Sequence, residues 1–285
     1  MSIVEGLLLG LKVSIGLLVL AIGLNARVTH ILTLFRQPGL LLRSLLAMYV
    51  LVPLVAVMLV WLPGISPGSQ LALIVLAISA GAPLLPRKLQ FLNRDRWIFS
   101  LMVITSLFAI AIVPLWIFII GLLLGVHSTL AISEVSSMLG KIFFLPMIIG
   151  MLFHWQRPAF SERFARLILR WVSPGLVACV LLLLALQWRL LLEAGWPLLL
   201  ALALLSLAAL FIGHVMGGPH LDGRVTLALA CVKRQAGVAI LVSAAVPGPR
   251  TEVFVAAYLV TSSLISLPYL KIQKYRRKAL LDAEV

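Results

Sequence analysis

The segment VTLALACVKRQAGVAILVSAAV, residues 225–246, is apolar enough to cross a membrane, yet Lys233 and Arg234 stand side by side near its middle. A cation at the centre of a membrane helix costs about 2.5–3.5 kcal/mol. Such residues usually face a protein interior or a water-filled cavity. Snorkelling of both side chains to the interface is the alternative, but apolar-dominated stretches flank the pair on both sides. The pair therefore indicates a functional site within the membrane.

The composition is that of a membrane protein with several spans. Of its 285 residues, 62% are hydrophobic and 11% charged, so we expect one integral membrane domain over residues 1–285. The net charge of +14 is explained by the topology argued below, and we expect no nucleic-acid partner. Cys179 and Cys231 offer neither a disulfide framework nor metal-ligand spacing, so we expect no cofactor or metal. No catalytic motif is present, which argues against an enzyme.

Nine segments are long and apolar enough to span a bilayer, which needs about 20 residues per helix. They are residues 3–24, 39–61, 69–86, 97–125, 132–154, 166–187, 196–217, 224–247 and 250–271. Seventeen lysines and arginines lie in the loops after the first, third, fifth and seventh segments or near the C-terminus, against two in the other loops. Because basic loops stay in the cytoplasm, we expect the N-terminus outside, the C-terminus inside, and a location in a bacterial inner membrane.

The third and eighth segments are interrupted in a similar way. The third contains Gly81, Pro83 and Pro86, and the eighth contains Lys233 and Arg234 followed by Gly237. Ala82 and Gln235 are 153 residues apart, and other landmarks repeat at similar offsets. An odd number of spans between the copies predicts an inverted repeat whose broken helices cross at a binding site. Repeat one covers about 3–125, a linking helix 132–154, repeat two about 166–271, and a basic cytoplasmic tail 272–285; simple proline kinks in packed helices are the alternative.

The chain resembles the bile acid:sodium symporter family. The stretch KVSIGLLVLAIGLNARVTHILTLFRQPGLLLRSLLAMYVLVPLVAV, residues 12–57, is similar to the family's opening, with Gly23-Leu24 and Pro53 in matching places. The resemblance runs from Lys12 to about Lys271 and points to a nine-helix form. It implies that two broken helices cross near the substrate and cation sites, and that a core domain moves against a panel domain. The implied activity is secondary active transport.

This sequence departs from the family where the family binds sodium. The first crossing motif, S-P-G-G-x-x-S-N, is replaced by SAGAPLLP at residues 79–86, so Leu85 and Pro86 occupy the Ser-Asn positions. The second, E-x-G-x-Q-N, is replaced by ACVKRQ at residues 230–235, with Ala230 at the carboxylate position and Arg234 at the Gln position. Met48 occupies a further Gln position. Since sodium needs several oxygen ligands, we expect no sodium site of the family's kind.

We interpret Lys233 or Arg234 as a fixed cation that takes over the electrostatic role of sodium and binds a small organic anion. Positive ends of the half-helices would add to it. Arg234 stays charged and can hold a carboxylate bidentately, whereas Lys233 is the better carrier of a coupled proton. The driving force is then the substrate gradient or a proton. The candidate substrate-binding residues are Ser79, Gly81, Pro83, Thr105, Ser106, Lys233, Arg234, Gln235, Ser262 and Ser263.

Several narrower alternatives stay open. Arg234 has a structural alternative, donating to carbonyl groups freed where the helices break. Ser262 and Ser263 could serve close helix packing instead of substrate contact. Cys231 beside the break keeps an arsenite-type metalloid exporter in view. A membrane sensor or partner protein that kept the fold without transport is the third reading.

Overall fold

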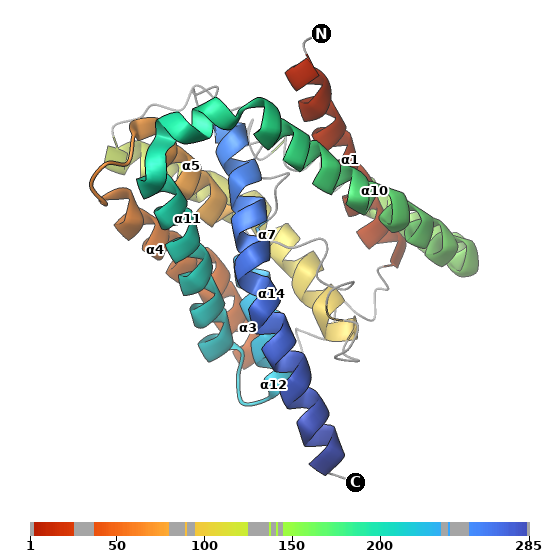
Figure 1. The fold of residues 1–285 in the computed structure, drawn as a ribbon. Coiled ribbons are helices and arrows are strands. Elements are labelled where there is room, and N and C mark those ends of the chain that lie inside the picture. The colour runs from red at the N-terminus through yellow and green to blue at the C-terminus, as the bar shows by residue number, and fades with distance from the viewer. Residues whose placement is uncertain are drawn as a thin grey trace.

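The computed structural model describes residues 3–25, 37–79, 89, 95–124, 137, 141, 145–234, 239 and 251–283. Every element named within this part of the chain is a helix, so the predicted all-α class is confirmed (Figure 1). The elements are α1 (Ile3–Asn25), α3 (Pro38–Leu46), the π-helix η1 (Ala47–Leu51), α4 (Val52–Val60), α5 (Pro67–Ile78), α7 (Asp95–Leu124), α9 (Leu145–Gln156), α10 (Pro158–Leu186), α11 (Trp188–Met216), α12 (Leu221–Val232) and α14 (Thr251–Ala283).

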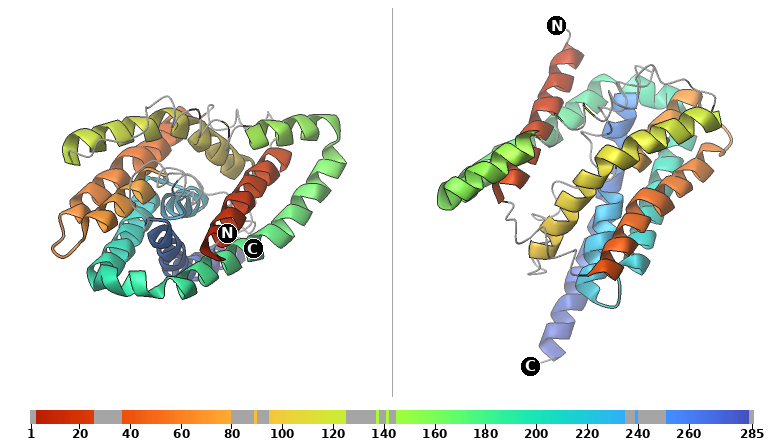
Figure 2. Two further views of the ribbon diagram at one scale, coloured as in Figure 1. Left: turned by 90° about the horizontal axis from the view of Figure 1, so that it is seen from above. Right: turned by 180° about the vertical axis from the view of Figure 1, so that it is seen from behind.

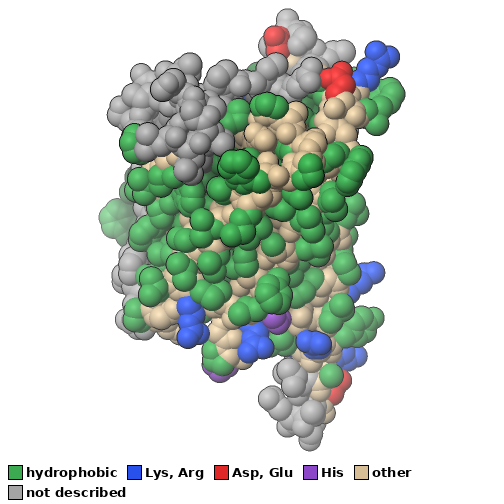
Figure 3. All heavy atoms as spheres, turned by 90° about the vertical axis from the view of Figure 1, so that its left-hand side faces the viewer, with side chains coloured by type: hydrophobic (Ala, Val, Ile, Leu, Met, Phe, Trp, Pro, Cys, Tyr) green, Lys and Arg blue, Asp and Glu red, His purple; other side chains and the backbone are tan. Residues whose placement is uncertain are grey.

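Five helical stretches within the described residues are long and apolar enough to cross a bilayer. They are Glu5–Asn25, Pro38–Val60, Pro158–Leu186, Trp188–Met216 and Val253–Ala279. A sixth is formed by two parts of α7, Ser100–Ser106 and Ala111–Ile119, which meet at a 49° bend. Hydrophobic side chains cover the middle of the molecule, and the lysines and arginines on the face in Figure 3 gather mainly toward the end where the C-terminus lies. The predicted polytopic membrane protein is confirmed.

The remaining predicted spans are described only in part. The third and eighth correspond to the twelve-residue helices α5 and α12, and the fifth to α9, which covers its second half. Two helices are longer than expected: α10 begins at Pro158, and α14 continues to Ala283. The extension of α14 follows from KIQKYRRKALLDA, which contains good helix formers and neither Gly nor Pro.

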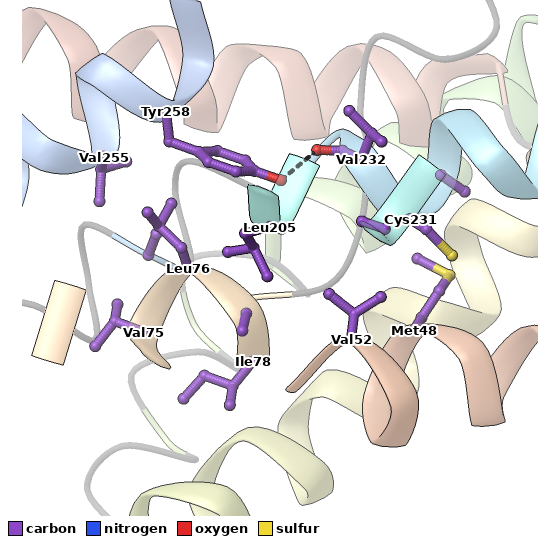
Figure 4. Packing of buried hydrophobic residues seen from close by; sticks show 14 of the residues in the cluster. Met48, Val52, Val75, Leu76, Ile78, Leu205, Cys231, Val232, Val255 and Tyr258 are labelled. Carbon is purple, nitrogen blue, oxygen red and sulfur yellow. Dashed lines mark hydrogen bonds between the residues drawn. The ribbon is translucent and has the colours of Figure 1, made fainter. Parts of the chain in front are cut away.

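The short helices α5 and α12 begin at opposite ends of the molecule. The loop before α5 lies at the upper end in Figure 1, and the loop before α12 lies at the lower end; the right-hand view of Figure 2 agrees. Their last residues, Ile78 and Val232, are 154 residues apart in the chain. Figure 4 places the ends of both helices around one buried centre. This arrangement fits the crossing predicted from the sequence, while the division of the chain into the two repeats stays a prediction.

The second span is irregular close to this centre. Val52 N–H donates to the Ala47 carbonyl, five residues back, and this bond defines η1. The next residue, Pro53, has no N–H to donate. Because Val52 donates to Ala47 and not to Met48, and Pro53 donates to nothing, two carbonyl groups lose their helical donor: Met48 and Tyr49. Side chains from other helices take both, as described below.

A second contact region joins α1, α9 and α10, which lie together in Figure 2. α1 and α9 approach at Gly23 and Gly150, where an added Cβ would lie 2.3 Å from the Met147 carbonyl oxygen and 2.6 Å from the Leu24 nitrogen. Glycine is therefore required at both positions for this close approach.

The carbonyl group of Leu24, in the last turn of α1, joins the same three helices. It accepts hydrogen bonds from His154 Nδ1 and from the Ser161 hydroxyl, each at 2.8 Å. These two bonds tie α9 and α10 to α1.

Candidate functional site

The candidate site begins where α12 ends. Lys233 caps the helix with an extended backbone (φ −84°, ψ 99°), and its N–H donates to the Leu229 carbonyl at 2.8 Å. The carbonyl of Val232 loses its helical donor at this break, and the Tyr258 hydroxyl of α14 donates to it at 2.8 Å (Figure 4). The break predicted from the sequence is thus present, and an aromatic side chain holds it.

Lys233 contacts two of the predicted site residues. Its Nζ donates to Ser263 Oγ at 2.8 Å and lies 3.4 Å from Ser262 Oγ. Both serine hydroxyls in turn donate to the Leu259 carbonyl, at 2.7 Å for Ser263 and 3.2 Å for Ser262. Their oxygens therefore face the ammonium as acceptors. The structure brings together three residues that the sequence analysis named separately, at the level of the break.

Arg234 is buried more deeply than Lys233. Its side chain is 3% exposed. One guanidinium nitrogen, Nη1, lies 3.3 Å from the Met48 carbonyl oxygen, which Val52 and Pro53 leave without a helical donor. The other two, Nε and Nη2, are buried without a hydrogen-bond partner among the described residues. The structural role weighed for Arg234 is thus present at one nitrogen, and the other two are left for a different partner.

The electrostatics of the break favour a cation. Each described half-helix presents its C-terminal end to the centre, and this end carries about half a negative charge from the helix dipole. Lys233 and Arg234 follow directly on the end of α12. The half-helix N-terminal ends that we expected to attract an anion lie outside the described residues. In the part described, the side-chain cations stand where helix ends favour positive charge.

Other predicted site residues turn their hydroxyl groups back onto their own helices. Ser79 caps α5 and donates to the Val75 carbonyl at 2.6 Å. Thr105 donates to Leu101 at 2.7 Å, and Ser106 donates to Met102 at 2.8 Å. All three are therefore committed as hydrogen-bond donors within their helices. Gly81, Pro83 and Gln235 lie outside the described residues.

Sequence reasoning missed a set of aromatic donors at the breaks. Trp116 Nε1 donates at 2.8 Å to the Tyr49 carbonyl, which Pro53 frees. The Tyr49 hydroxyl donates to the carbonyl of Thr105, just before the bend in α7. Together with Tyr258, these side chains hold three irregular points of the backbone. Pro53 was the available signal, since a proline within a helix predicts freed carbonyls, but it does not say which side chain will reach them.

The described residues offer no group of three His, Cys, Asp or Glu side chains that could hold a metal ion. Cys231 is fully buried, and Figure 4 shows its sulfur near that of Met48. The centre therefore combines two cations, hydroxyl groups and soft apolar sulfur. Such a set suits an anion with an apolar body better than a hard cation.

The comparisons with known proteins agree with this architecture. The family model described as the sodium bile acid symporter family matches residues 12–194, from α1 into the start of α11. The match ends before α12, so Lys233, Arg234 and the two serines lie beyond it. A search of curated proteins found no match. The matched region covers more than half of the chain, and the chain therefore belongs to the sodium bile acid symporter family, whose members are membrane transporters.

Proposed function

We propose that the protein is a secondary carrier that moves a small organic anion by alternating access, with the charge of Lys233 and Arg234 in the place of bound sodium. Membership of the family supports a transporter of the bile acid symporter type. The observation that carries the proposal is Arg234, which is 3% exposed at the break of α12 and has two guanidinium nitrogens without a hydrogen-bond partner among the described residues.

A buried charge without a counter-charge is expensive. Breaking a buried ion pair by removing one partner typically costs about 3–5 kcal/mol, because the remaining charge is left uncompensated. The Met48 carbonyl and the end of α12 offset part of this cost for Arg234. An anionic substrate would offset more, and binding would be driven by that gain. The Lys233 ammonium, held by Ser263 and Ser262, adds a second positive charge to the same break.

The backbone oxygens near the break also argue against sodium. Transporters that bind sodium at broken helices use carbonyl groups freed where the helices unwind. Here the carbonyls of Met48, Tyr49 and Val232, and that of Thr105 next to the bend in α7, each accept a hydrogen bond from a side chain. A further cation next to Arg234 would also be repelled, by about 3 kcal/mol at 5 Å and an effective dielectric of 20. We infer transport driven by the substrate gradient or by a proton.

The charge distribution supports a bacterial inner membrane with the C-terminus in the cytoplasm. The last turns of α14 carry Lys271, Lys274, Arg276, Arg277 and Lys278. Basic residues favour the cytoplasmic side, where they also meet anionic lipid headgroups.

Uptake by proteoliposomes tests the proposal. Purified protein is reconstituted, offered a mixed pool of organic anions in sodium-free buffer, and the vesicle contents are read by mass spectrometry. We expect a compound to accumulate with the wild type and with Lys271→Ala, an exposed lysine of α14, but not with Lys233→Ala.

Two results would contradict the proposal in different ways. Uptake that persists in Lys233→Ala would show that transport does not need the charge of Lys233. Uptake that appears only after sodium is added would show that the protein binds sodium. Cys231→Ser belongs in the same series with arsenite as substrate, because loss of arsenite transport in this variant alone would support the metalloid exporter instead.

A further inference from the structure

We infer that Arg234 is the specificity-determining residue of the site and that it binds a carboxylate group side-on, through Nε and Nη2. This inference rests on the proposed function and assigns its anion a chemical class. It follows from which nitrogens of the guanidinium are already used and which are not.

A guanidinium offers its donors along distinct edges of a plane. Nε and Nη2 share one edge and present two parallel N–H bonds there, while Nη1 can donate along another edge. In this protein Nη1 lies against the Met48 carbonyl. The two nitrogens without a partner among the described residues are the pair that forms the side-on fork. A carboxylate matches this fork with two oxygens at the right spacing, in parallel hydrogen bonds.

The bond to Met48 orients the fork and fixes its position. The Met48 carbonyl is available because Val52 donates to Ala47 instead, and Pro53, the next residue, has no N–H to offer. The second span therefore positions Arg234, which follows α12. A guanidinium tied at one nitrogen loses less freedom when it binds a ligand with the other two. Carboxylate binding needs no existing hydrogen bond of Arg234 to break.

The Tyr258 hydroxyl is a competing acceptor. It lies close to the guanidinium, but outside hydrogen-bond geometry to Nε and Nη2. Its own proton goes to the Val232 carbonyl at 2.8 Å. The Tyr258 hydroxyl is thus engaged in holding the break, and the edge with Nε and Nη2 is the one that a ligand can meet.

Lys233 serves a different purpose from Arg234. Its ammonium donates to Ser263 at 2.8 Å, and an ammonium acts as a point charge without a planar fork. We assign to Lys233 attraction of any anion and to Arg234 the choice of a planar two-oxygen group. The fork is buried, so a carboxylate reaches it only when the surrounding helices part, as alternating access requires.

The test is ligand-induced stabilisation of the detergent-solubilised full chain. The probes are acetate, propionate, benzoate and cyclohexanecarboxylate as choline salts, each compared with its neutral primary amide at the same concentration and ionic strength. A ligand that binds only the folded protein raises the melting temperature. We expect at least one carboxylate to raise the melting temperature of the wild type by more than its neutral amide does.

The key variant is Arg234→Lys, which keeps the positive charge and loses the fork. We expect it to weaken carboxylate binding about tenfold or more, because the lysine ammonium is a point charge and cannot form the two parallel charge-assisted hydrogen bonds of the fork. Arg189→Lys, an exposed arginine at the start of α11, is the matched control and should behave as the wild type.

The inference is overturned if no carboxylate stabilises the wild type above its amide, or if Arg234→Lys binds carboxylates as tightly as the wild type does. Failure of the proposed function looks different, because uptake would then be independent of Lys233 even where carboxylates stabilise the protein through Arg234.

Discussion

Trp116→Phe should destabilise the protein through a single carbonyl group, and Pro53→Ala should remove most of that effect. In the wild type, Trp116 Nε1 donates to the Tyr49 carbonyl at 2.8 Å, and Pro53 leaves this carbonyl without its helical donor. Removing the indole donor leaves a buried acceptor unpaired, which costs about 1–3 kcal/mol. The smaller ring adds a packing loss that is the same in both backgrounds.

The size of the coupling between Trp116→Phe and Pro53→Ala follows from what Trp116→Phe does in the Pro53→Ala protein. In Pro53→Ala, residue 53 regains an N–H that can donate to Tyr49, four residues back, or to Met48, five residues back. The indole donor then matters less, and Trp116→Phe should cost only its packing loss. The double-mutant cycle should therefore give a coupling free energy of about 1–2 kcal/mol, in which unfolded-state effects of the proline substitution cancel.

The assay is equilibrium unfolding by sodium dodecyl sulfate in mixed micelles, followed by far-ultraviolet circular dichroism because the variant changes tryptophan fluorescence. Trp171→Phe, a tryptophan 69% exposed on α10, is the matched control and should show no coupling to Pro53→Ala. Additivity of Trp116→Phe and Pro53→Ala within about 0.3 kcal/mol would refute the account of the freed carbonyl.

Three further predictions concern the helix contacts and the lysine pocket. Gly150→Ala should destabilise the protein by about 1–3 kcal/mol, because the added Cβ would lie 2.6 Å from the Leu24 nitrogen. Gly16→Ala is the control and should be neutral or stabilising, because the space around its Cβ is open. Thermal melts of both variants check this. His154→Ala and Ser161→Ala should each lower the free energy of unfolding little through the hydrogen bond itself, because the Leu24 carbonyl keeps its other donor. In the double variant, the free energy of unfolding should fall by about 1–3 kcal/mol more than the sum of the two single effects. The sodium dodecyl sulfate unfolding assay measures this. Ser263→Ala removes the acceptor 2.8 Å from Lys233 Nζ and should reduce anion uptake about tenfold without lowering the melting temperature by more than a few degrees; unchanged uptake would exclude this serine from the site.

Much of the site was predictable because its residues are conspicuous in an apolar sequence. Lys233 and Arg234 stand out by the cost of charge in hydrocarbon, and Ser262 and Ser263 by their place in the last span. The structure places Lys233 in contact with both serines, which the sequence had not predicted. The tie between Arg234 and Met48 was not predicted, because backbone carbonyls carry no sequence identity. Pro53 indicates one freed carbonyl, but only the tertiary structure shows the second and decides that side chains of α7 and of the end of α12 reach them.

Ser79, Thr105 and Ser106 show the limit of reasoning from residue type. Each was a sound candidate, since a hydroxyl group near a break can contact a substrate. In the structure each donates to a carbonyl of its own helix, an option that serine and threonine have in any helix. Sequence pattern alone does not distinguish the two uses, because both need the same side chain at the same depth.

The sequence by itself determined the all-helical membrane architecture, the two interrupted helices and the cation pair at the second break. These features depend on local terms: apolar length, the missing donor of proline, and the cost of a charge in lipid. The tertiary structure decided how the two cations divide their roles. It placed Lys233 against the serines of α14 and tied Arg234 by one nitrogen to the second span. The fork of Arg234 depends on residues 186 positions apart in the chain, and only folding brings such groups together.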